Sequence, residues 1–418
     1  MMLPRGADGR IALAADLARH HFAPAASAER RIGAEVEVLP LDAATGGIAP
    51  LEGTDRALLP FLRRFGASRC WTEGQTEKGT PCFGVPGGGR ITFEPGGQLE
   101  YSAPPARSAS ALIHNVRDVI GPLRACAADD GFDLAAIGIE PDRDVIDAPL
   151  QLAAERYARM DAYFATIGPF GARMMRQTAS FQVCLDVDRE GSARWRVLNA
   201  AAPYVVAMFT NSPRYAGAMT DQQSVRAMCW RRLDPARTGV VAGGRPVHDY
   251  LAFALAAPDM LRGDADGDYH PFGEWLDAGA ASLDDWRHHL STLFPEVRPR
   301  GYLEVRGADA VDAACWAAPI ALLGGLACDE TARAAAFDLL GDSDPGLLDT
   351  AGAHGLRDAR MATVAGQLAE IALRGCRSLG TSFMTETHLD EAYSFFERYT
   401  FRGRSPADDA REQSLRYW

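Results

Sequence analysis

The chain has 418 residues, of which 47% are hydrophobic and 23% are charged, values that are ordinary for a soluble globular protein. Its 43 Lys and Arg residues against 55 Asp and Glu residues give a formal net charge of −12 at pH 7. Because nucleic-acid-binding proteins carry a basic surface, this balance argues against nucleic acid as a partner, although it leaves room for a local basic pocket.

Two features of the sequence predict a cytoplasmic protein. Residues 1–10 lack the apolar core of a signal peptide, and the longest apolar stretches, such as 316–328, are too short to cross a membrane, which takes about 20 residues. The eight cysteines form no Cys-x-x-Cys pair, which is typical of reduced thiols rather than of a disulfide framework or a zinc site. Cys70 and Cys82 could still pair across a hairpin.

The first predicted elements are a helix and a strand that carries two acids. Residues 11–22 have the spacing of an amphipathic helix, and residues 31–39 alternate between apolar and polar as a strand does. Glu35 and Glu37 are two residues apart, so they share one face of this strand. Carboxylates suit Mg²⁺ as ligands, but alternate glutamates are also common on a solvated strand face.

A hairpin is predicted over residues 81–100, because a Pro-Gly-Gly-Gly turn signal separates two β-prone runs. Glu94, Gln98 and Glu100 have the same parity, so they face one side unless Pro-Gly-Gly at 95–97 inserts a bulge or a break. Acidic groups among apolar neighbours suggest a compensating cation or arginine. The alternative is a polar hairpin end whose glycines serve only the turn.

Helices and strands are predicted to alternate through the rest of the chain. The expected order is a helix over 108–129, a strand over 132–139, a helix over 152–167, a turn around Gly168 and Gly171, a strand over 178–187, helices over 195–210 and 283–294, and a strand over 301–306. An Ala-rich, mostly helical segment follows from residue 308 to the end. With no repeat and no obvious linker, this pattern predicts one mixed sheet in one domain with a helical C-terminal end.

Three more charged residues invite a functional interpretation. Glu304 and Arg306 share one face of the strand over 301–306. They could bind a metal and a phosphate, since arginine offers a planar fork to anions, or they could form a surface ion pair of little energetic value. Arg226 is a lone charge in an apolar segment, and it fits either a substrate carboxylate or an ordinary helix surface.

Several common catalytic motifs are absent from the sequence. Gly87-Gly88-Gly89 is not followed by the Gly-Lys-Ser/Thr of a Walker loop, no Gly-x-Gly-x-x-Gly lies between a strand and a helix, and there is no Gly-x-Ser-x-Gly elbow. His288 and His289 are adjacent in a predicted helix, so they point in different directions and make a poor metal pair. Three strand-like segments with inward carboxylates remain, and they suggest a metal site beside arginines that could hold nucleotide phosphates.

These segments together resemble the second family of glutamate–cysteine ligases, which includes the plant-type enzymes and the actinobacterial ligase that opens ergothioneine biosynthesis. The matching stretches, in family order, are Gly33–Glu37, Phe93–Glu100, Gly168–Asp186, Phe209–Pro213, Asp234–Gly239, Leu293–Arg298 and Tyr302–Asp309. The Glu-Pro-Gly-Gly-Gln run is the specific part of the resemblance, whereas Gly-x-Glu-x-Glu alone is a weak signal.

The resemblance implies an α+β, glutamine-synthetase-like catalytic fold, in which an antiparallel-rich mixed sheet cups the active site and helices pack outside. We expect a single catalytic domain over residues 1–418, with 25–330 as the ligase core and 331–418 as a helical C-terminal segment. The implied cofactors are ATP and Mg²⁺. In the implied reaction, ATP phosphorylates the side-chain carboxylate of L-glutamate, and the amine of L-cysteine attacks the γ-glutamyl phosphate to give γ-glutamylcysteine.

By motif position, the resemblance also implies a role for each candidate residue. The implied metal ligands are Glu35, Glu37, Glu100 and Glu304; the catalytic residues are Arg306, on a phosphate, and Glu94; the substrate-binding residues are Arg226, which orients glutamate, Gln98 and Gln182. The chemistry agrees, because Mg²⁺ neutralises the phosphates while the protein mainly positions the reactants. No nucleophilic serine or cysteine is needed.

The chain departs from the plant-type pattern at three places. It has Met228 where that pattern has His, Cys184 where Asn is frequent, and a different sequence over 310–313. These changes fall near the expected substrate pocket, so they bear on the amine substrate more than on the ATP chemistry. The alternatives are a ligase that joins glutamate to another amine, and a non-catalytic relative that binds nucleotide or amino acid; the retained acids weigh against the latter. No oligomeric state is predicted.

Overall fold

The computed structural model describes residues 2–24, 30–54, 56–188, 192–263 and 267–415 of the chain. The core boundary predicted at residue 25, and the predicted domain ends at residues 1 and 418, lie outside these described residues.

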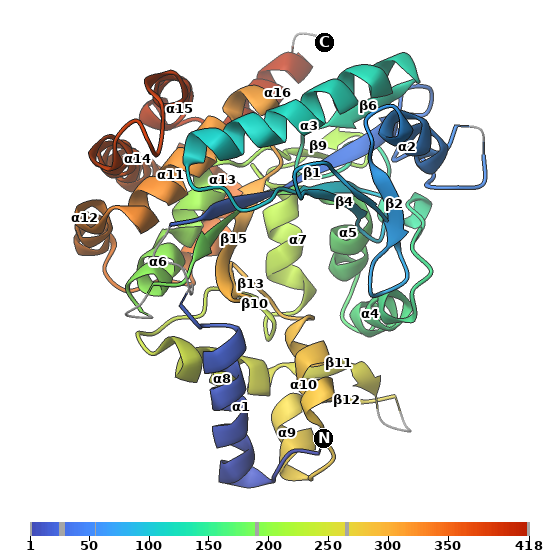
Figure 1. The fold of residues 1–418 in the computed structure, drawn as a ribbon, viewed down its shortest axis with the longest axis vertical. Coiled ribbons are helices and arrows are strands. Elements are labelled where there is room, and N and C mark those ends of the chain that lie inside the picture. The colour runs from blue at the N-terminus through green and yellow to red at the C-terminus, as the bar shows by residue number, and fades with distance from the viewer. Residues whose placement is uncertain (1, 25–29, 55, 189–191, 264–266, 416–418) are drawn as a thin grey trace.

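The structure is built around one antiparallel sheet (Figure 1). Among the described residues it has nine strands in the order β14-β15-β7-β1-β5-β4-β3-β2, and β6 pairs with the far end of β1. The strands are β1 Ile32–Asp42, β2 Thr72–Gln75, β3 Pro81–Gly84, β4 Arg90–Phe93, β5 Leu99–Ser102, β6 Phe132–Ala135, β7 Ser180–Asp186, β14 Val297–Pro299 and β15 Tyr302–Asp309. The long strands β1, β7 and β15 are adjacent and form the centre of the sheet.

The two faces of the sheet differ because the strands alternate between apolar and polar side chains. Val36 on β1, Val183 on β7 and Val305 on β15 are all at most 2% exposed, and they belong to the main apolar core. Burial of such a side chain contributes about 1.5–3 kcal/mol. The alternate positions on the same strands are polar, so they point to the opposite face.

Helices surround the sheet and account for most of the remaining chain. The helices before residue 300 are α1 Gly6–His20, α2 Leu58–Ala67, α3 Ala109–Asp129, α4 Glu155–Ala165, α5 Phe170–Gln177, α6 Ala193–Met208, α7 Val225–Leu233, α8 Pro246–Ala256, α9 Phe272–Asp277 and α10 Leu283–Leu290. The later ones are α11 Ala317–Cys328, α12 Glu330–Leu340, α13 Leu347–His354, α14 Ala359–Leu379, α15 Glu386–Arg398 and α16 Pro406–Leu415. Helices α3 and α11 contact β1 and β7 respectively.

Three short strand pairs lie outside the sheet. They are β8 Arg214–Tyr215 with β9 Ala218–Met219, β10 Thr238–Gly239 with β13 Phe294–Pro295, and β11 Pro258–Gly263 with β12 Tyr269–Pro271. Helices α1, α8, α9 and α10 gather around β11 and β12 at one end of the molecule, as Figure 1 shows.

Helix α11 is the centre of the C-terminal helical layer. It is apolar on every side and buried along its whole length, which is typical of a helix enclosed by others. It packs against α14, where a Cβ built at Gly325 would lie only 2.2 Å from the carbonyl oxygen of Ala372, so the two helices approach at backbone distance. The main apolar core continues across residue 330, from Leu3 to Tyr399.

The structure decides two sequence-based predictions near the polar face of the sheet. Residues 95–97 form the break that the sequence left open, a turn between β4 and β5 closed by a hydrogen bond from the Gly97 N–H to the Glu94 carbonyl, so Glu94 and Glu100 do not share one strand. Where the sequence predicts a turn around Gly168 and Gly171, helix α5 begins at Phe170 and already includes Gly171.

Two other predictions concern membranes and disulfides. In the described part of the chain, no helix has both the length and the apolar character needed to cross a membrane. All eight cysteines are described, and all are free thiols. The register of β2 and β3 pairs Cys82 with Gly74, which leaves Cys70 outside the hairpin, so the suggested Cys70–Cys82 bridge is wrong for this structure.

Candidate active site

Three rows of side chains cross the polar face of the sheet. Residues that pair directly on antiparallel strands point to the same face, and the strand registers align them as follows. The first row is Arg298, Glu304, Cys184 and Gly33; the second is Gln182, Glu35, Ser102 and Arg90; the third contains Glu37, Glu100 and Thr92. The predicted metal ligands therefore come from three neighbouring parts of one surface.

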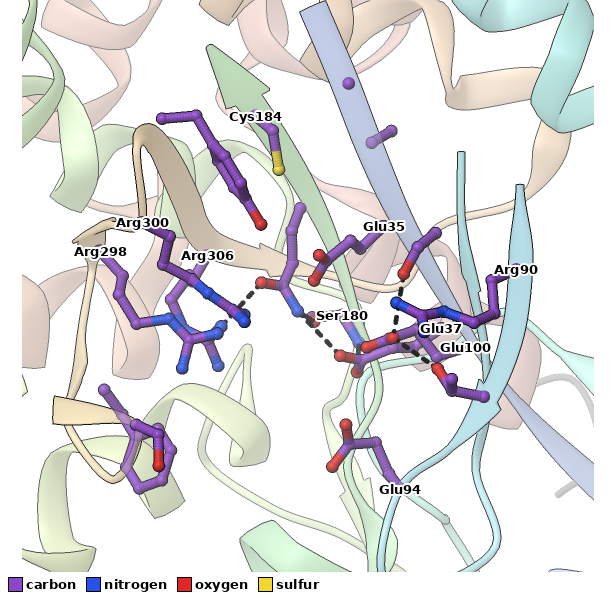
Figure 2. Close-up of a pocket in the computed structure, with 18 of the residues that line it drawn as sticks. Glu35, Glu37, Arg90, Glu94, Glu100, Ser180, Cys184, Arg298, Arg300 and Arg306 are labelled. Carbon is purple, nitrogen blue, oxygen red and sulfur yellow. Dashed lines mark hydrogen bonds between the residues drawn. The ribbon is translucent and has the colours of Figure 1, made fainter. Parts of the chain in front are cut away.

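This surface forms the floor of a cavity of about 880 Å³. Figure 2 shows Arg298, Arg300 and Arg306 on one side of it and the carboxylates of Glu37, Glu94 and Glu100 on the other. Of the nine residues predicted for the site, eight line the cavity, namely Glu35, Glu37, Glu94, Gln98, Glu100, Gln182, Arg226 and Arg306. The ninth, Glu304, is fully buried beneath them.

Glu304 is a carboxylate held by arginines on one of its two oxygens. Arg298 Nε and Arg306 Nη1 both donate to Oε2, at 2.7 and 2.6 Å. Burial alone would raise the pKa of Glu304, but Arg298 and Arg306 outweigh it and bring the pKa to about 2, so this group stays ionised. Oε1 accepts no hydrogen bond from any residue that the structure describes.

The carboxylate of Glu304 belongs to a cluster that could hold a cation. One ligand atom each from Glu35, Cys184 and Glu304 lies within 4.8 Å of the others. Burial raises the pKa of Glu35, and the nearby charges of Glu304 and Glu100 raise it further. Burial also raises the pKa of the Cys184 thiol, with Glu35 and Glu304 adding to the effect. A divalent cation between these groups would relieve the repulsion.

Gln182 links the arginine side of the cavity to the acidic side. Its Oε1 accepts from Arg306 Nη1 at 2.8 Å, and its Nε2 donates to Glu37 Oε1 at 2.9 Å (Figure 2). The Ser180 N–H donates to the other oxygen of Glu37 at 2.6 Å. Burial nevertheless raises the pKa of Glu37, and the nearby charge of Glu100 raises it further.

Glu94 and Glu100 complete the acidic side. The Thr92 hydroxyl donates to Glu100 at 2.8 Å, and the Ser102 hydroxyl donates to the same oxygen at 3.2 Å. Burial, followed by the charges of Glu100 and Glu37, raises the pKa of Glu94 to about 8. Such crowding of carboxylates is expected where cations neutralise them.

Gln98 lines the cavity, but its side chain is engaged by the backbone. The amide oxygen accepts from the Gly96 N–H at 2.9 Å, and the amide nitrogen donates to the carbonyls of Met175 and Thr178 at 3.3 and 3.0 Å. These bonds fix the turn that carries Glu94. The geometry thus favours a positioning role for Gln98 over the substrate contact that the sequence suggested.

Two backbone carbonyls and a buried carboxylate hold the guanidinium of Arg226 in place. It lies at the start of α7 and is 3% exposed, so the helix-surface alternative is wrong. Its guanidinium donates to the carbonyls of Arg306 and Gly307, at 2.8 and 3.4 Å, and lies 3.6 Å from the buried carboxylate of Asp309. These partners fix its direction relative to Arg306.

Sequence reasoning did not assign a role to Arg298, Arg300 or Cys184. Arg298 faces Glu304 directly across the β14–β15 hairpin, and the short Arg-Pro-Arg-Gly-Tyr turn was a local signal for that pairing. Arg300 lies in the same turn, with Nη1 at 3.6 Å from Glu304 Oε1. Cys184 was visible only as a departure from the plant-type pattern, and its pairing with Glu304 depends on strands far apart in sequence.

The fold has a counterpart among solved structures. The glutamate–cysteine ligase of Francisella tularensis, solved in complex with AMP, superimposes with a TM-score of 0.57 at 11% identity, covering 94% of this chain and 86% of that one. The sheet with its cupped polar face and outer helices therefore defines the α+β, glutamine-synthetase-like class, as predicted.

The sequence comparisons are more specific. The family model of glutamate–cysteine ligase family 2 matches residues 31–410. The glutamate–cysteine ligase EgtA of Mycobacterium tuberculosis strain H37Rv is 35% identical over 346 residues, covering 78% of this chain and 77% of the relative. The chloroplastic glutamate–cysteine ligase of Arabidopsis thaliana is 31% identical over 275 residues, covering 61% and 52%. The chain belongs to glutamate–cysteine ligase family 2, which confirms the resemblance.

Proposed function

We propose that the protein catalyses the ATP-dependent ligation of L-glutamate to L-cysteine. The γ-carboxylate of glutamate is activated as γ-glutamyl phosphate, and the products are γ-glutamylcysteine, ADP and phosphate. The observation that carries this proposal is the fully buried, ionised Glu304, whose Oε1 accepts no hydrogen bond from the described residues and whose carboxylate lies within 4.8 Å of Glu35, beside a set of arginines. A buried carboxylate oxygen of this kind is suited to a cation next to phosphates.

The residues present fit Mg²⁺, because the carboxylates that line the cavity offer several of the oxygen ligands that Mg²⁺ takes. Glu35, Glu37, Glu100 and Glu304 would hold it. When bound, Mg²⁺ neutralises phosphate charge and favours transfer of the γ-phosphoryl group of ATP.

The arginines and Glu94 are the proposed groups around the reacting atoms. Arg306 contacts the transferring phosphate, and its bonds to Glu304 and Gln182 hold its guanidinium in place. Arg226, fixed by Asp309, orients the α-carboxylate of glutamate. Glu94 lies opposite the arginines, where its carboxylate can bind a cation or the incoming ammonium group (Figure 2).

The identity of the second substrate rests on the relatives. Those compared above are named as glutamate–cysteine ligases, and this supports cysteine as the amine. We propose a cytoplasmic enzyme that acts on small molecules and not on nucleic acid, in agreement with the acidic net charge. We also propose that the chain consists of a ligase core, residues 25–330, and a helical C-terminal segment, residues 331–418.

The test is a mass-spectrometric assay with ATP, Mg²⁺, L-glutamate and L-cysteine, in which released phosphate is measured in parallel. We expect γ-glutamylcysteine and phosphate in equal amounts. Glu304→Gln should abolish both, while Glu397→Gln, at an exposed position outside the cavity, should leave both unchanged. Phosphate release without this product would point to another amine, to be identified by an amine panel. A folded protein with neither product would refute the proposal.

A further inference from the structure

A thiol stands among the carboxylates at one end of the site. Cys184 is half-buried on β7 and pairs directly with Glu304 on β15 and with Gly33 on β1. Its sulfur lies within 4.8 Å of a carboxylate oxygen of Glu35 and one of Glu304. Figure 2 shows the side chain of Cys184 on the same side of the sheet as Glu35.

The residue opposite Cys184 on strand β1 is Gly33. A Cβ added at Gly33 would lie 3.4 Å from the Cβ of Cys184, which is ordinary van der Waals contact. Because glycine carries no side chain, the space on this face beside Cys184 is left open, and Glu35 is the next residue of β1 on the same face.

A second and independent observation points to a ligand at this place. Glu304 is 0% exposed, and its Oε1 has no hydrogen-bond partner among the residues that the structure describes. An ionised oxygen left without a hydrogen bond in the interior is unfavourable, so a ligand is expected to satisfy it. Arg300 Nη1 lies 3.6 Å from this oxygen, on a side chain that is half exposed.

From this geometry we propose that Glu35, Cys184 and Glu304 form a mixed thiolate–carboxylate site that binds a borderline divalent cation such as Zn²⁺ or Co²⁺ in preference to Mg²⁺. Thiolate sulfur is a ligand for zinc and related metals, whereas Mg²⁺ takes oxygen ligands almost exclusively. Two carboxylate oxygens and one sulfur give three protein ligands, which leaves one position of a tetrahedral ion open.

This inference rests on the proposed use of Glu35 and Glu304 as cation ligands and narrows it by adding a ligand and a metal preference: these two residues would hold Mg²⁺ only when no borderline cation is present. The remaining carboxylates, Glu37, Glu94 and Glu100, offer only oxygen and keep their suitability for Mg²⁺ in either case. The cavity floor thus divides into a sulfur-containing position near Arg298 and an all-oxygen position near Thr92.

The test is the absorption spectrum of the full-length protein titrated with Co²⁺ in the absence of ATP. The background is Cys70→Ser/Cys126→Ser, because these two exposed thiols could bind the metal adventitiously. We expect a sulfur-to-cobalt charge-transfer band at one equivalent of metal, unchanged by excess Mg²⁺. Cys184→Ser should remove the band, while Cys315→Ser, at a half-buried thiol outside the cavity, should retain it.

Calorimetric titration with Zn²⁺ gives the corresponding affinities. Loss of one ligand should weaken binding at least about tenfold, since even outer-shell changes around a metal cost 10–100-fold. Cys184→Ser and Glu304→Gln should both reach that limit, with circular dichroism used to verify folding. A charge-transfer band that survives in Cys184→Ser, a cobalt spectrum without sulfur character, or displacement of the ion by Mg²⁺ would overturn the proposal. None of these readings depends on ligase activity.

Discussion

Asp309→Asn is the sharpest test of how the site is anchored. Asp309 is 1% exposed, and its Oδ2 accepts from the Asn211 N–H at 2.7 Å and from the Ser212 hydroxyl at 2.6 Å. Its Oδ1 accepts from the Ser224 hydroxyl at 2.9 Å and lies 3.6 Å from Arg226. Burial raises the pKa of Asp309, while Arg226 and these hydrogen bonds oppose the rise.

The size of the expected stability loss follows from the hydrogen bonds that asparagine can still make at this position. Its amide oxygen can still accept the two bonds at the Oδ2 position, but the amide nitrogen would face Ser224 and Arg226 without a negative charge. Removal of one partner from a buried ion pair costs about 3–5 kcal/mol. Because Arg226 keeps its bonds to two backbone carbonyls, we expect the lower limit, about 3 kcal/mol of the free energy of unfolding.

Two measurements separate this anchoring from a general loss of stability. Urea unfolding gives the change in stability. Steady-state kinetics should show that the KM for glutamate rises at least about tenfold, which corresponds to about 1.4 kcal/mol. The KM for ATP should stay unchanged. Asp312→Asn is the matched control: this residue is half exposed and pairs with Arg124 on the surface, so its loss should cost at most about 1 kcal/mol. Wild-type stability and an unchanged glutamate KM in Asp309→Asn would refute the reasoning.

Further predictions concern packing and pH. Gly325→Ala should destabilise the protein by about 1–3 kcal/mol in urea unfolding, because the new methyl group would meet the Ala372 carbonyl. Gly366→Ala, in helix α14, where the new Cβ would lie 3.7 Å from Phe401 in ordinary contact, should be neutral or stabilise by up to about 1 kcal/mol. Equal effects would contradict the close α11–α14 contact. Burial lowers the pKa of His289 from 6.5 to about 3, so below pH 6.5 the unfolded chain binds a proton that the folded protein excludes. The contribution of His289 to stability should therefore fall by about 2 kcal/mol between about pH 7 and about pH 5. The difference in unfolding free energy between the wild type and His289→Gln should shrink by that amount over this pH range, and a difference that stays constant with pH would remove His289 as the cause.

Local sequence patterns predicted the strands of the site but not every contact between them. The alternation around Glu35 and Glu37 gave the correct facing, since it depends only on the two-residue period of a strand. Helix α5 was missed because its eight residues begin within a Gly-Pro-Phe-Gly stretch that is typical of a turn. The hydrophobic period carried little information over so short a length.

The arrangement of residues between strands could not be predicted from the pattern alone. Cys184 and Glu304 are opposite each other only because β7 pairs with β15, a choice made by the packing of the whole sheet. Likewise, nothing local to Gln98 revealed that Met175 and Thr178 would accept its amide protons. His289 is buried in the structure, and its Nε2 lies 2.8 Å from the Ala254 carbonyl oxygen, a contact between residues 35 positions apart that no local pattern announced.

The strand order also constrains when the site can form during synthesis of the chain. β1 is made early, yet its partner β7 begins at Ser180, and β7 acquires its second neighbour only with Tyr302–Asp309. Until then, Glu35 and Glu37 lie on a nascent strand without the arginines that neutralise Glu304. Such distant pairings fold slowly, because a long loop must close before any contact compensates for its entropy. A chain released before residue 309 would thus contain most of the acids and none of the completed centre.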